Sequence, residues 1–286
     1  SGALALRGTL GKRGEEWRGT LASLQLKPTR GASWQLDQAA DFAWGQGRGR
    51  IGGACLRASE GEGRLCVNGE WPGQGIALHG NGLSLALLQG YVPEREGGGR
   101  WRMHGDIALE AQLRPVGGRW SGEADIASAI GGIAPLRRRP SGRPPPPDLA
   151  SYRELRLHAS FDPNGLRATL GSDFADGGRL DAQLAGGWAE DSALTGTVAI
   201  STSNVGWLEL FSPDIVAPTG HVEGHLQLGG TRAHPRLGGD AALTNFQTEV
   251  PALGITLREG TLRMQAQPDG NASLQGQMRS GEGVLQ

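Results

Sequence analysis

Residues 194–200 read Leu-Thr-Gly-Thr-Val-Ala-Ile, a pattern of apolar, any, Gly, any, apolar, any, apolar. Successive side chains of an extended strand point to opposite faces. The pattern therefore places Leu194, Val198 and Ile200 on one face together with Gly196, and mostly polar residues on the other. It predicts a β-strand with one apolar face and one polar face.

The same pattern recurs along the chain. Further copies occupy residues 103–109, 120–126, 222–228 and 237–243. A succession of amphipathic strands separated by Gly, Asn-Gly and Pro-Gly turns predicts an all-β fold with little or no helix. One short segment, residues 205–211, is expected to be helical. The chain starts and stops within the pattern, and we interpret it as a piece of a longer repetitive protein.

The composition excludes several classes of protein. The formal net charge is −1, from 28 basic and 29 acidic residues, which argues against a nucleic-acid partner. Glycine accounts for 49 residues, well above an average usage of roughly 7%, but without the Gly-X-Y period of collagen. No apolar run approaches the roughly 20 residues that span a bilayer.

The two cysteines, Cys55 and Cys66, flank an acidic Gly-containing turn at residues 60–63. Two neighbouring strands joined by such a turn would bring the sulfurs within bonding distance. We therefore predict a disulfide and, with it, an oxidising compartment. The alternative is two buried free thiols.

The organisation of the chain changes once. Residues 1–132 and 151–286 both carry the strand pattern, and we predict that they are segments of one continuous trough. Residues 133–150 contain Arg-Arg-Arg at 137–139 and four prolines at 144–147, which cannot donate to a sheet. We interpret this stretch as a solvated basic loop; the alternative is contact with an acidic partner or lipid headgroups.

No constellation of residues predicts catalysis, and we expect neither an enzyme nor a cofactor nor a metal site. Gly47, Gly49 and Gly52 spell G-x-G-x-x-G, but no strand–turn–helix context surrounds them. His221 and His225 share a strand face about 13 Å apart at roughly 3.3 Å per residue, too far for one metal ion. Five of the eight tryptophans are expected at strand ends or next to turns, where they would pack at the margins of the sheet: Trp17, Trp71, Trp101, Trp120 and Trp188.

An amphipathic sheet must cover its apolar face. A sandwich core is usually filled by aromatic residues, and a transmembrane barrel carries aromatic girdles, but aromatic residues make up only 5% of this chain. We therefore predict a third solution, an elongated sheet curled into a U-shaped hydrophobic groove. Glycines on the inner face would let the strands bend.

A groove lined by aliphatic side chains suits lipid acyl chains. Each buried CH₂ gains about 0.8 kcal/mol, so a 16-carbon chain would gain roughly 12 kcal/mol. Because that gain is nearly uniform along the groove, a lipid could slide with little net cost. The predicted lining residues are Ile107, Leu109, Ile126, Leu155, Leu157, Leu166, Leu170, Leu180, Leu184, Leu194, Val198, Ile200, Val222, Leu226, Leu228, Leu243, Ile255, Leu257, Leu262, Met264 and Leu274.

From Leu208 onward the chain resembles the C-terminal part of the TamB family. The residues that carry the resemblance are Pro213, Gly220, Gly224, Gly230, Thr231, Pro235, Gly239, Leu253, Gly254, Ile255, Gly270, Leu274, Gly276 and residues 280–283. Cys55-Leu56, Leu65-Cys66 and Gly69-Glu-Trp71 are similar to the paired-cysteine segment of the family.

The resemblance implies a periplasmic, groove-shaped β fold, called a β-taco, related to AsmA-like and bridge-type lipid transfer proteins. It implies movement of phospholipid between the inner and outer membranes, with an inner-membrane anchor outside this segment. It also implies support of outer-membrane protein assembly with a TamA-like outer-membrane barrel partner.

Two other functions remain open. The edge strands could form a scaffold that pairs with nascent outer-membrane strands by β-augmentation. Alternatively, the chain could be a passenger-like β-solenoid with a closed core. The inner face distinguishes a solenoid from an open groove, because a solenoid needs its inner face filled by side chains and free of water.

Overall fold

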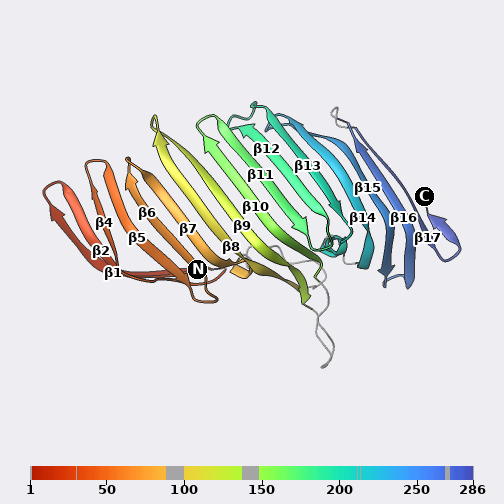
Figure 1. The fold of residues 1–286 in the computed structure, drawn as a ribbon, viewed down its shortest axis with the longest axis horizontal. Helices are drawn as coiled ribbons and strands as arrows, with labels where there is room; N and C mark the ends of the chain where they lie inside the picture. Colours follow the sequence, from red (N-terminus) through yellow and green to blue (C-terminus); the bar gives the residue numbers. More distant parts are fainter. Residues whose placement is uncertain are drawn as a thin grey trace, which may run out of the picture. The chain divides into compact units, whose positions relative to one another are not determined.

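Nearly every described residue lies in a β-strand or in the turn between two strands. The computed structural model of the chain describes residues 2–29, 31–87, 100–136, 148–210, 212, 214–267 and 271–285. Within these residues, hydrogen bonds connect 18 strands as an antiparallel sheet (Figure 1). The prediction of an all-β fold is therefore confirmed. The U-shaped curl of the whole sheet stays a prediction.

The chain folds as two compact units. Unit 1 comprises residues 1–92, 105–129 and 157–164. It contains β1 (Ala3–Arg13), β2 (Glu16–Lys27), β3 (Trp34–Leu36), β4 (Ala40–Gly45), β5 (Arg48–Ala58), β6 (Arg64–Trp71) and β7 (Gly75–Ser84). Three strands contribute residues to both units: β8 (Arg100–Val116), β9 (Arg119–Leu136) and β10 (Ala150–Asp162).

Unit 2 comprises residues 93–104, 130–156 and 165–286. It contains β11 (Gly165–Phe174), β12 (Arg179–Gly187), β13 (Leu194–Thr202), the 3₁₀ helix η2 (Gly206–Leu210), β14 (Val216–Gly230), β15 (Pro235–Val250), β16 (Ile255–Ala266), β17 (Ala272–Ser280) and β18 (Gly283–Leu285). From β11 to β18, each strand pairs antiparallel with the next. The helix η2 confirms the short helical segment expected at residues 205–211.

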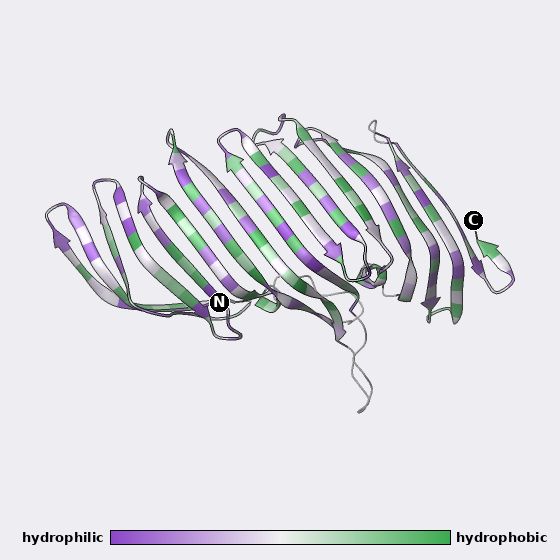
Figure 2. Cartoon of the chain, viewed as in Figure 1, coloured by the Kyte–Doolittle hydropathy of each residue, from purple (hydrophilic) through white to green (hydrophobic). Residues whose placement is uncertain are grey.

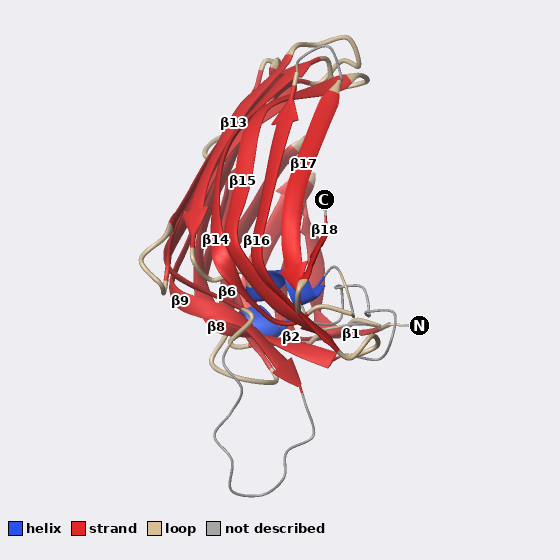
Figure 3. Cartoon of the chain, turned by 90° about the vertical axis from the view of Figure 1, so that its right-hand side faces the viewer, coloured by secondary structure: helices blue, strands red, loops and turns tan. Residues whose placement is uncertain are grey.

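One bulge interrupts each of β14, β15 and β16. The register shifts around Ala217, Asn245 and Glu259, where one strand has an extra residue relative to its neighbour. All three residues have a positive φ, between 49° and 51°. A bulge bends its strand and increases the local twist, and Figure 3 shows these strands bending along their length.

Bulges also occur in unit 1. The register between β1 and β2 shifts at Ala22, because Arg7 pairs with Ser23 and Gly8 pairs with Leu21. Further shifts lie beside Gly53 on β5 and Gly82 on β7, and both glycines have a positive φ. Glycine tolerates this conformation because it has no Cβ.

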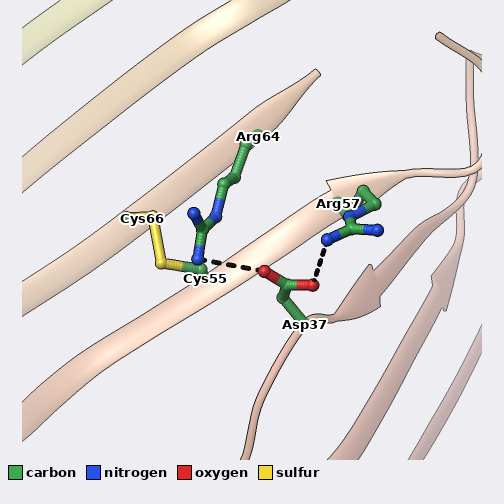
Figure 4. The surroundings of a disulfide bond; sticks show 5 residues. All are labelled: Asp37, Cys55, Arg57, Arg64 and Cys66. Atoms are coloured by element: carbon green, nitrogen blue, oxygen red, sulfur yellow. Dashed lines mark hydrogen bonds and ion pairs between the residues drawn. A yellow bond between two sulfur atoms is a disulfide. The ribbon is translucent and has the colours of Figure 1, made fainter. Parts of the chain in front are cut away.

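A disulfide joins Cys55 of β5 to Cys66 of β6, as predicted, at directly opposed positions of the two strands (Figure 4). Asp37, which follows β3, accepts a hydrogen bond from Arg57 at 2.6 Å and forms an ion pair with Arg64 at 3.0 Å. The disulfide and the ion pairs together connect β5, β6 and the residue that follows β3, which are neighbours in the sheet. The alternative of two free thiols is wrong.

The predicted loop at residues 133–150 is only partly described. Strand β9 continues to Leu136, and β10 begins at Ala150. The arginines and prolines at 137–147 lie outside the described residues. The predicted division into segments 1–132, 133–150 and 151–286 stays a prediction.

Candidate functional site

The candidate site of unit 2 is the apolar face of its sheet, here called the unit 2 face. Directly opposed residues of antiparallel strands share a face, so the register defines rows of side chains across the sheet. One row consists of Leu180, Ile200, Gly224, Ala241, Met264 and Leu274. A second row consists of Leu170, Ala182, Val198, Leu226, Gly239 and Ala266.

The structure brings the predicted lining residues of unit 2 together on this face. On the register, the following share it: Leu166, Leu170, Leu180, Leu184, Leu194, Val198, Ile200, Val222, Leu226, Leu228, Leu243, Leu262, Met264 and Leu274. Ile255 and Leu257 follow beyond the bulge at Glu259, opposite Val250 and Thr248. Leu155 of β10 is half-buried beside the exposed Arg156.

The opposite face of unit 2 is polar. Its matching row reads Asp173, Arg179, Ser201, Glu223, Ala242, Arg263 and Gln275. Hydrophobic and hydrophilic residues therefore alternate along the strands in Figure 2. The sheet separates an apolar surface from a polar one by the thickness of a single layer.

Unit 1 has an apolar face of its own, here called the unit 1 face. Ile107 and Leu109, which the sequence predicted as lining, pair with Leu83 and Gly80 of β7. Ile126 and Leu157 are half-buried and alternate with exposed neighbours.

Sequence reasoning missed most of the unit 1 face. One row across it consists of Leu10, Gly19, Phe42, Ile51, Gly69, Ile76 and Leu113. The alternation of apolar and polar residues that marks this face is present in the sequence of residues 1–87. The pairing of those strands, with bulges between them, obscured which residues share a face.

Most side chains of both faces are only half-buried. Among the described residues, the buried apolar side chains are Ala40, Ala43, Ala54, Ala58, Leu83, Leu149, Val205 and Phe246. The chain exposes 18607 Å², whereas two globular domains of about 15 kDa each would together expose about 14,000 Å². Neighbouring side chains of the same sheet cover the sides of each lining side chain. The part of each lining side chain that points away from the sheet stays accessible.

One end of the unit 2 face is covered by the segment around η2. Val205 is 1% exposed and lies beside Leu149 in the lining of a cavity of about 430 Å³. The carboxylate of Glu209, 5% exposed, accepts a hydrogen bond from the backbone N–H of Ala217 at 2.8 Å. Asp176 accepts hydrogen bonds from the Thr202 hydroxyl at 2.9 Å and the Asn204 N–H at 2.6 Å.

The environment of Asp176 lowers the pKa of its carboxyl group below 3.8. Partial burial acts to raise the pKa, but the hydrogen bonds from Thr202 and from the N–H groups of Gly178, Asn204 and Ser203 outweigh it. A carboxylate that accepts several hydrogen bonds is favoured in its charged form. The ionised side chain therefore holds the turn that leads into η2.

Replacing Asp176 with asparagine should lower the unfolding temperature at neutral pH. Because the folded pKa lies below the unfolded value, the carboxylate stabilises the fold at pH above about 3.8, and this stabilisation is lost as the pH falls through the folded pKa. The difference between wild type and Asp176→Asn should therefore shrink in acid. Thermal melts by circular dichroism at several pH values measure the difference in unfolding temperature between wild type and Asp176→Asn. A difference that does not change with pH would contradict the prediction.

Among the described residues, no group of three or more His, Cys, Asp or Glu side chains could hold a metal ion. Gly47 and Gly49 lie at the hairpin between β4 and β5, and Gly52 lies within β5, so no helix follows the motif. In the same part of the chain, no helix combines the length and the apolar character needed to cross a membrane.

The fold and the site define a class, that of proteins built on an amphipathic antiparallel sheet whose apolar face stays accessible. The chain matches the family model described as TamB, N-terminal domain, over residues 1–243. It therefore belongs to the TamB family, which is part of an envelope transport and assembly module. No curated protein and no solved structure matches the chain.

The match confirms the family predicted from the sequence but changes the region concerned. The motifs after Leu208 had suggested the C-terminal part of the family, whereas the matching model is that of the N-terminal domain. Residues 208–243 fall within the match, and residues 244–286 fall outside it. Each copy of the repeated strand pattern resembles the others. The pattern by itself therefore does not distinguish the N-terminal domain of the family from its C-terminal part.

Proposed function

We propose that the chain forms a periplasmic, lipid-conducting groove of a TamB-family protein and moves phospholipids between the inner and outer membranes. The observation that carries the proposal is the half-buried apolar face. Leu226, for example, lies between Val198 and Gly239 on neighbouring strands, yet part of its surface stays accessible. An acyl chain on this face would complete the burial, at about 0.8 kcal/mol per CH₂.

Two further features support this proposal. The polar face opposite, with charged residues such as Arg179 and Glu223, can stay in water while the apolar face holds lipid. The disulfide between Cys55 and Cys66 suits an oxidising compartment such as the periplasm. The half-buried lining argues against the closed core of a β-solenoid.

A second candidate function rests on the edge of the sheet. All eleven residues of β1 are exposed, and among the described strands its antiparallel ladder runs along β2. A strand edge with free N–H and C=O groups can accept a further strand by β-augmentation. We propose this edge as the place where the chain would support outer-membrane protein assembly, with a TamA-like barrel as partner of the whole protein.

Photo-crosslinking tests the lipid proposal. A crosslinking amino acid at Leu226 or Leu109 should yield phospholipid adducts in cells. The matched controls are Gln227 and Ala108, adjacent residues whose side chains are exposed on the opposite face. Equal labelling of both sets, or labelling of neither, would contradict a lipid conduit on the apolar face.

A further inference from the structure

Four hairpins of unit 1 turn back at the same edge of the sheet. Their turns lie at residues 14–15, 46–47, 72–74 and 117–118, after β1, β4, β6 and β8. Strand pairing places these turns next to one another, and Figure 1 shows them along the upper ends of the red-to-yellow strands. We call residues 12–18, 44–50, 70–75 and 113–121, which contain the four turns, the hairpin edge.

One side of the hairpin edge carries tryptophans. Trp17 pairs with Trp44, and the rings of Trp71 and Trp120 are 4.4 Å apart. The sequence predicted that Trp17, Trp71 and Trp120 pack at the margin of the sheet, and Trp71 and Trp120 do contact each other. Trp17 and Trp120 are nevertheless 43% exposed, and Trp44 is 54% exposed. Accessible indoles favour the boundary between apolar and aqueous surroundings.

The other side of the hairpin edge carries arginines, because the two residue types alternate along the strands. Arg18 pairs with Ala43, which pairs with Arg50, so these residues form a row on the polar face of unit 1. Arg18 forms an ion pair with Glu16 at 2.6 Å. Within the described residues, the other arginines of this edge form no ion pair. The exposed arginines of the hairpin edge are Arg13, Arg18, Arg48, Arg50, Arg114 and Arg119.

The hairpin edge is therefore basic, although the chain has a net charge of −1. Lys12 brings its basic residues to seven, against the three acidic residues Glu15, Glu16 and Glu70. The opposite edge of unit 1 differs, because residues 55–66 hold two arginines and two glutamates. Both of those arginines also form ion pairs with Asp37. Positive charge and exposed indoles thus coincide at the hairpin edge, a combination that complements anionic lipid headgroups.

The positions of the tryptophans suit a shallow contact with a bilayer. Each of the four lies within two residues of its turn, or about 7 Å at roughly 3.3 Å per residue. The headgroup region of a bilayer is roughly 5–8 Å thick on each side, which is half the difference between a total of 40–45 Å and a core of 30 Å. An edge that enters as far as its indoles therefore stays within the headgroup region. The turns expose their backbone there to water and headgroups rather than to hydrocarbon.

We propose that the hairpin edge docks unit 1 onto the surface of a bilayer that contains anionic phospholipids. The indoles enter between the headgroups, and the arginines contact lipid phosphates from the other side of the sheet. Both residue types can reach the same headgroup layer, because the two faces of a single-layered sheet meet at its edge. This inference goes beyond the proposed function, since it needs no lipid on the unit 1 face. An acidic protein surface would explain the arginines but would leave the exposed indoles without a role.

Vesicle flotation tests the docking. The chain should float with vesicles of phosphatidylcholine and phosphatidylglycerol, and at least 10-fold more weakly with phosphatidylcholine alone. Arg48→Gln combined with Arg114→Gln should weaken the apparent affinity for the anionic vesicles about 10-fold or more, since each arginine near a charged surface contributes roughly 5-fold. The matched control is Arg258→Gln combined with Arg263→Gln, which removes the same charge from exposed positions of unit 2. This control should change the affinity less than 2-fold.

A pair of tryptophan variants tests the role of the indoles. Trp44→Ala should weaken binding at least 3-fold. Trp188→Ala should leave it unchanged, because Trp188 is 47% exposed but stands beside Glu190 and Asp191. Circular dichroism melts check that each variant stays folded. Loss of binding in the arginine variant without any loss in Trp44→Ala would overturn the docking, because an acidic surface of any kind would then suffice.

Two further outcomes would also overturn the docking. One is equal binding to neutral and anionic vesicles, and the other is an equal loss from both arginine pairs. Photo-crosslinking at Leu109 and Leu226 separates this inference from the lipid conduit. Lipid adducts at those positions without flotation would refute the docking and leave the conduit intact. Flotation without adducts would support the docking and count against the conduit.

Discussion

Replacing Leu226 with arginine is expected to reduce phospholipid transfer about 10- to 100-fold. Leu226 lies within a row of half-buried apolar side chains, between Val198 and Gly239. A guanidinium group there would lie among acyl chains, which costs about 3 kcal/mol on insertion scales. About 1.4 kcal/mol corresponds to a factor of ten. The long arginine stem can carry the charge toward water, which sets the lower bound.

The matched control is Gln227→Arg, because Gln227 is exposed on the opposite face, across from Gly238. It should transfer phospholipid at nearly the wild-type rate. Transfer between donor and acceptor vesicles, followed with a fluorescent phospholipid, measures both variants. Circular dichroism should show the same β-sheet signal in each. Global unfolding of Leu226→Arg would instead show that Leu226 belongs to a closed core.

Replacing Gly239 with alanine is expected to destabilise unit 2 by about 3 kcal/mol or more. Gly239 has a φ of +113°, which side chains disfavour. A Cβ there would lie 2.1 Å from the carbonyl oxygen of His225 and 2.9 Å from the Cα of Leu226. Both atoms belong to the backbone of β14, so β14 and β15 would have to separate. A loss of this size falls among the large effects of single substitutions.

Gly229 supplies the control for that substitution. A Cβ on Gly229 would meet nothing within 4 Å, and its φ lies outside the positive range. Gly229→Ala should therefore change the free energy of unfolding by less than about 0.5 kcal/mol. The unfolding temperature of Gly239→Ala should fall by roughly 6–12 °C, at 2–4 °C per kcal/mol. Equal melting of the two variants would contradict the steric argument.

Local patterns in the sequence predict the strands well. Alternation at residues 194–200 places Val198 and Ile200 on one face, and the register of β13 with β14 agrees. The turn between Cys55 and Cys66 correctly indicated the disulfide. The register change near Ala22 was also predictable, because Leu21 and Leu24 are three residues apart and so break the alternation of every second residue. In each case the signal lies within a few neighbouring residues.

The bulges on β14, β15 and β16 were not predictable from the sequence. Ala217, Asn245 and Glu259 adopt a positive φ, although alanine and glutamate carry no local preference for it. Their conformation results from the pairing of each strand with neighbours that have one residue fewer at that point. The bends of unit 2 therefore arise from register, which depends on several strands at once.

The tryptophans of unit 1 illustrate the same limit. The sequence places Trp17, Trp71 and Trp120 near strand ends, but they are separated by tens of residues. Strand pairing aligns Trp17 with Trp44, and the folded sheet brings the ring of Trp71 against that of Trp120. Their exposure was equally hidden, because an indole beside a turn can be covered or open without any change in its neighbours along the chain.

The sequence by itself determined that this protein is a chain of amphipathic strands, which residues face the apolar side of the unit 2 strands, and which family it belongs to. The first two of these properties follow from the period of two residues that every extended strand shares. Only the tertiary structure decided which strands align, where the sheet bends and that Leu226 and its neighbours stay half-buried. An apolar side chain has the same sequence signature whether or not another layer of protein covers it, because covering is a property of distant segments.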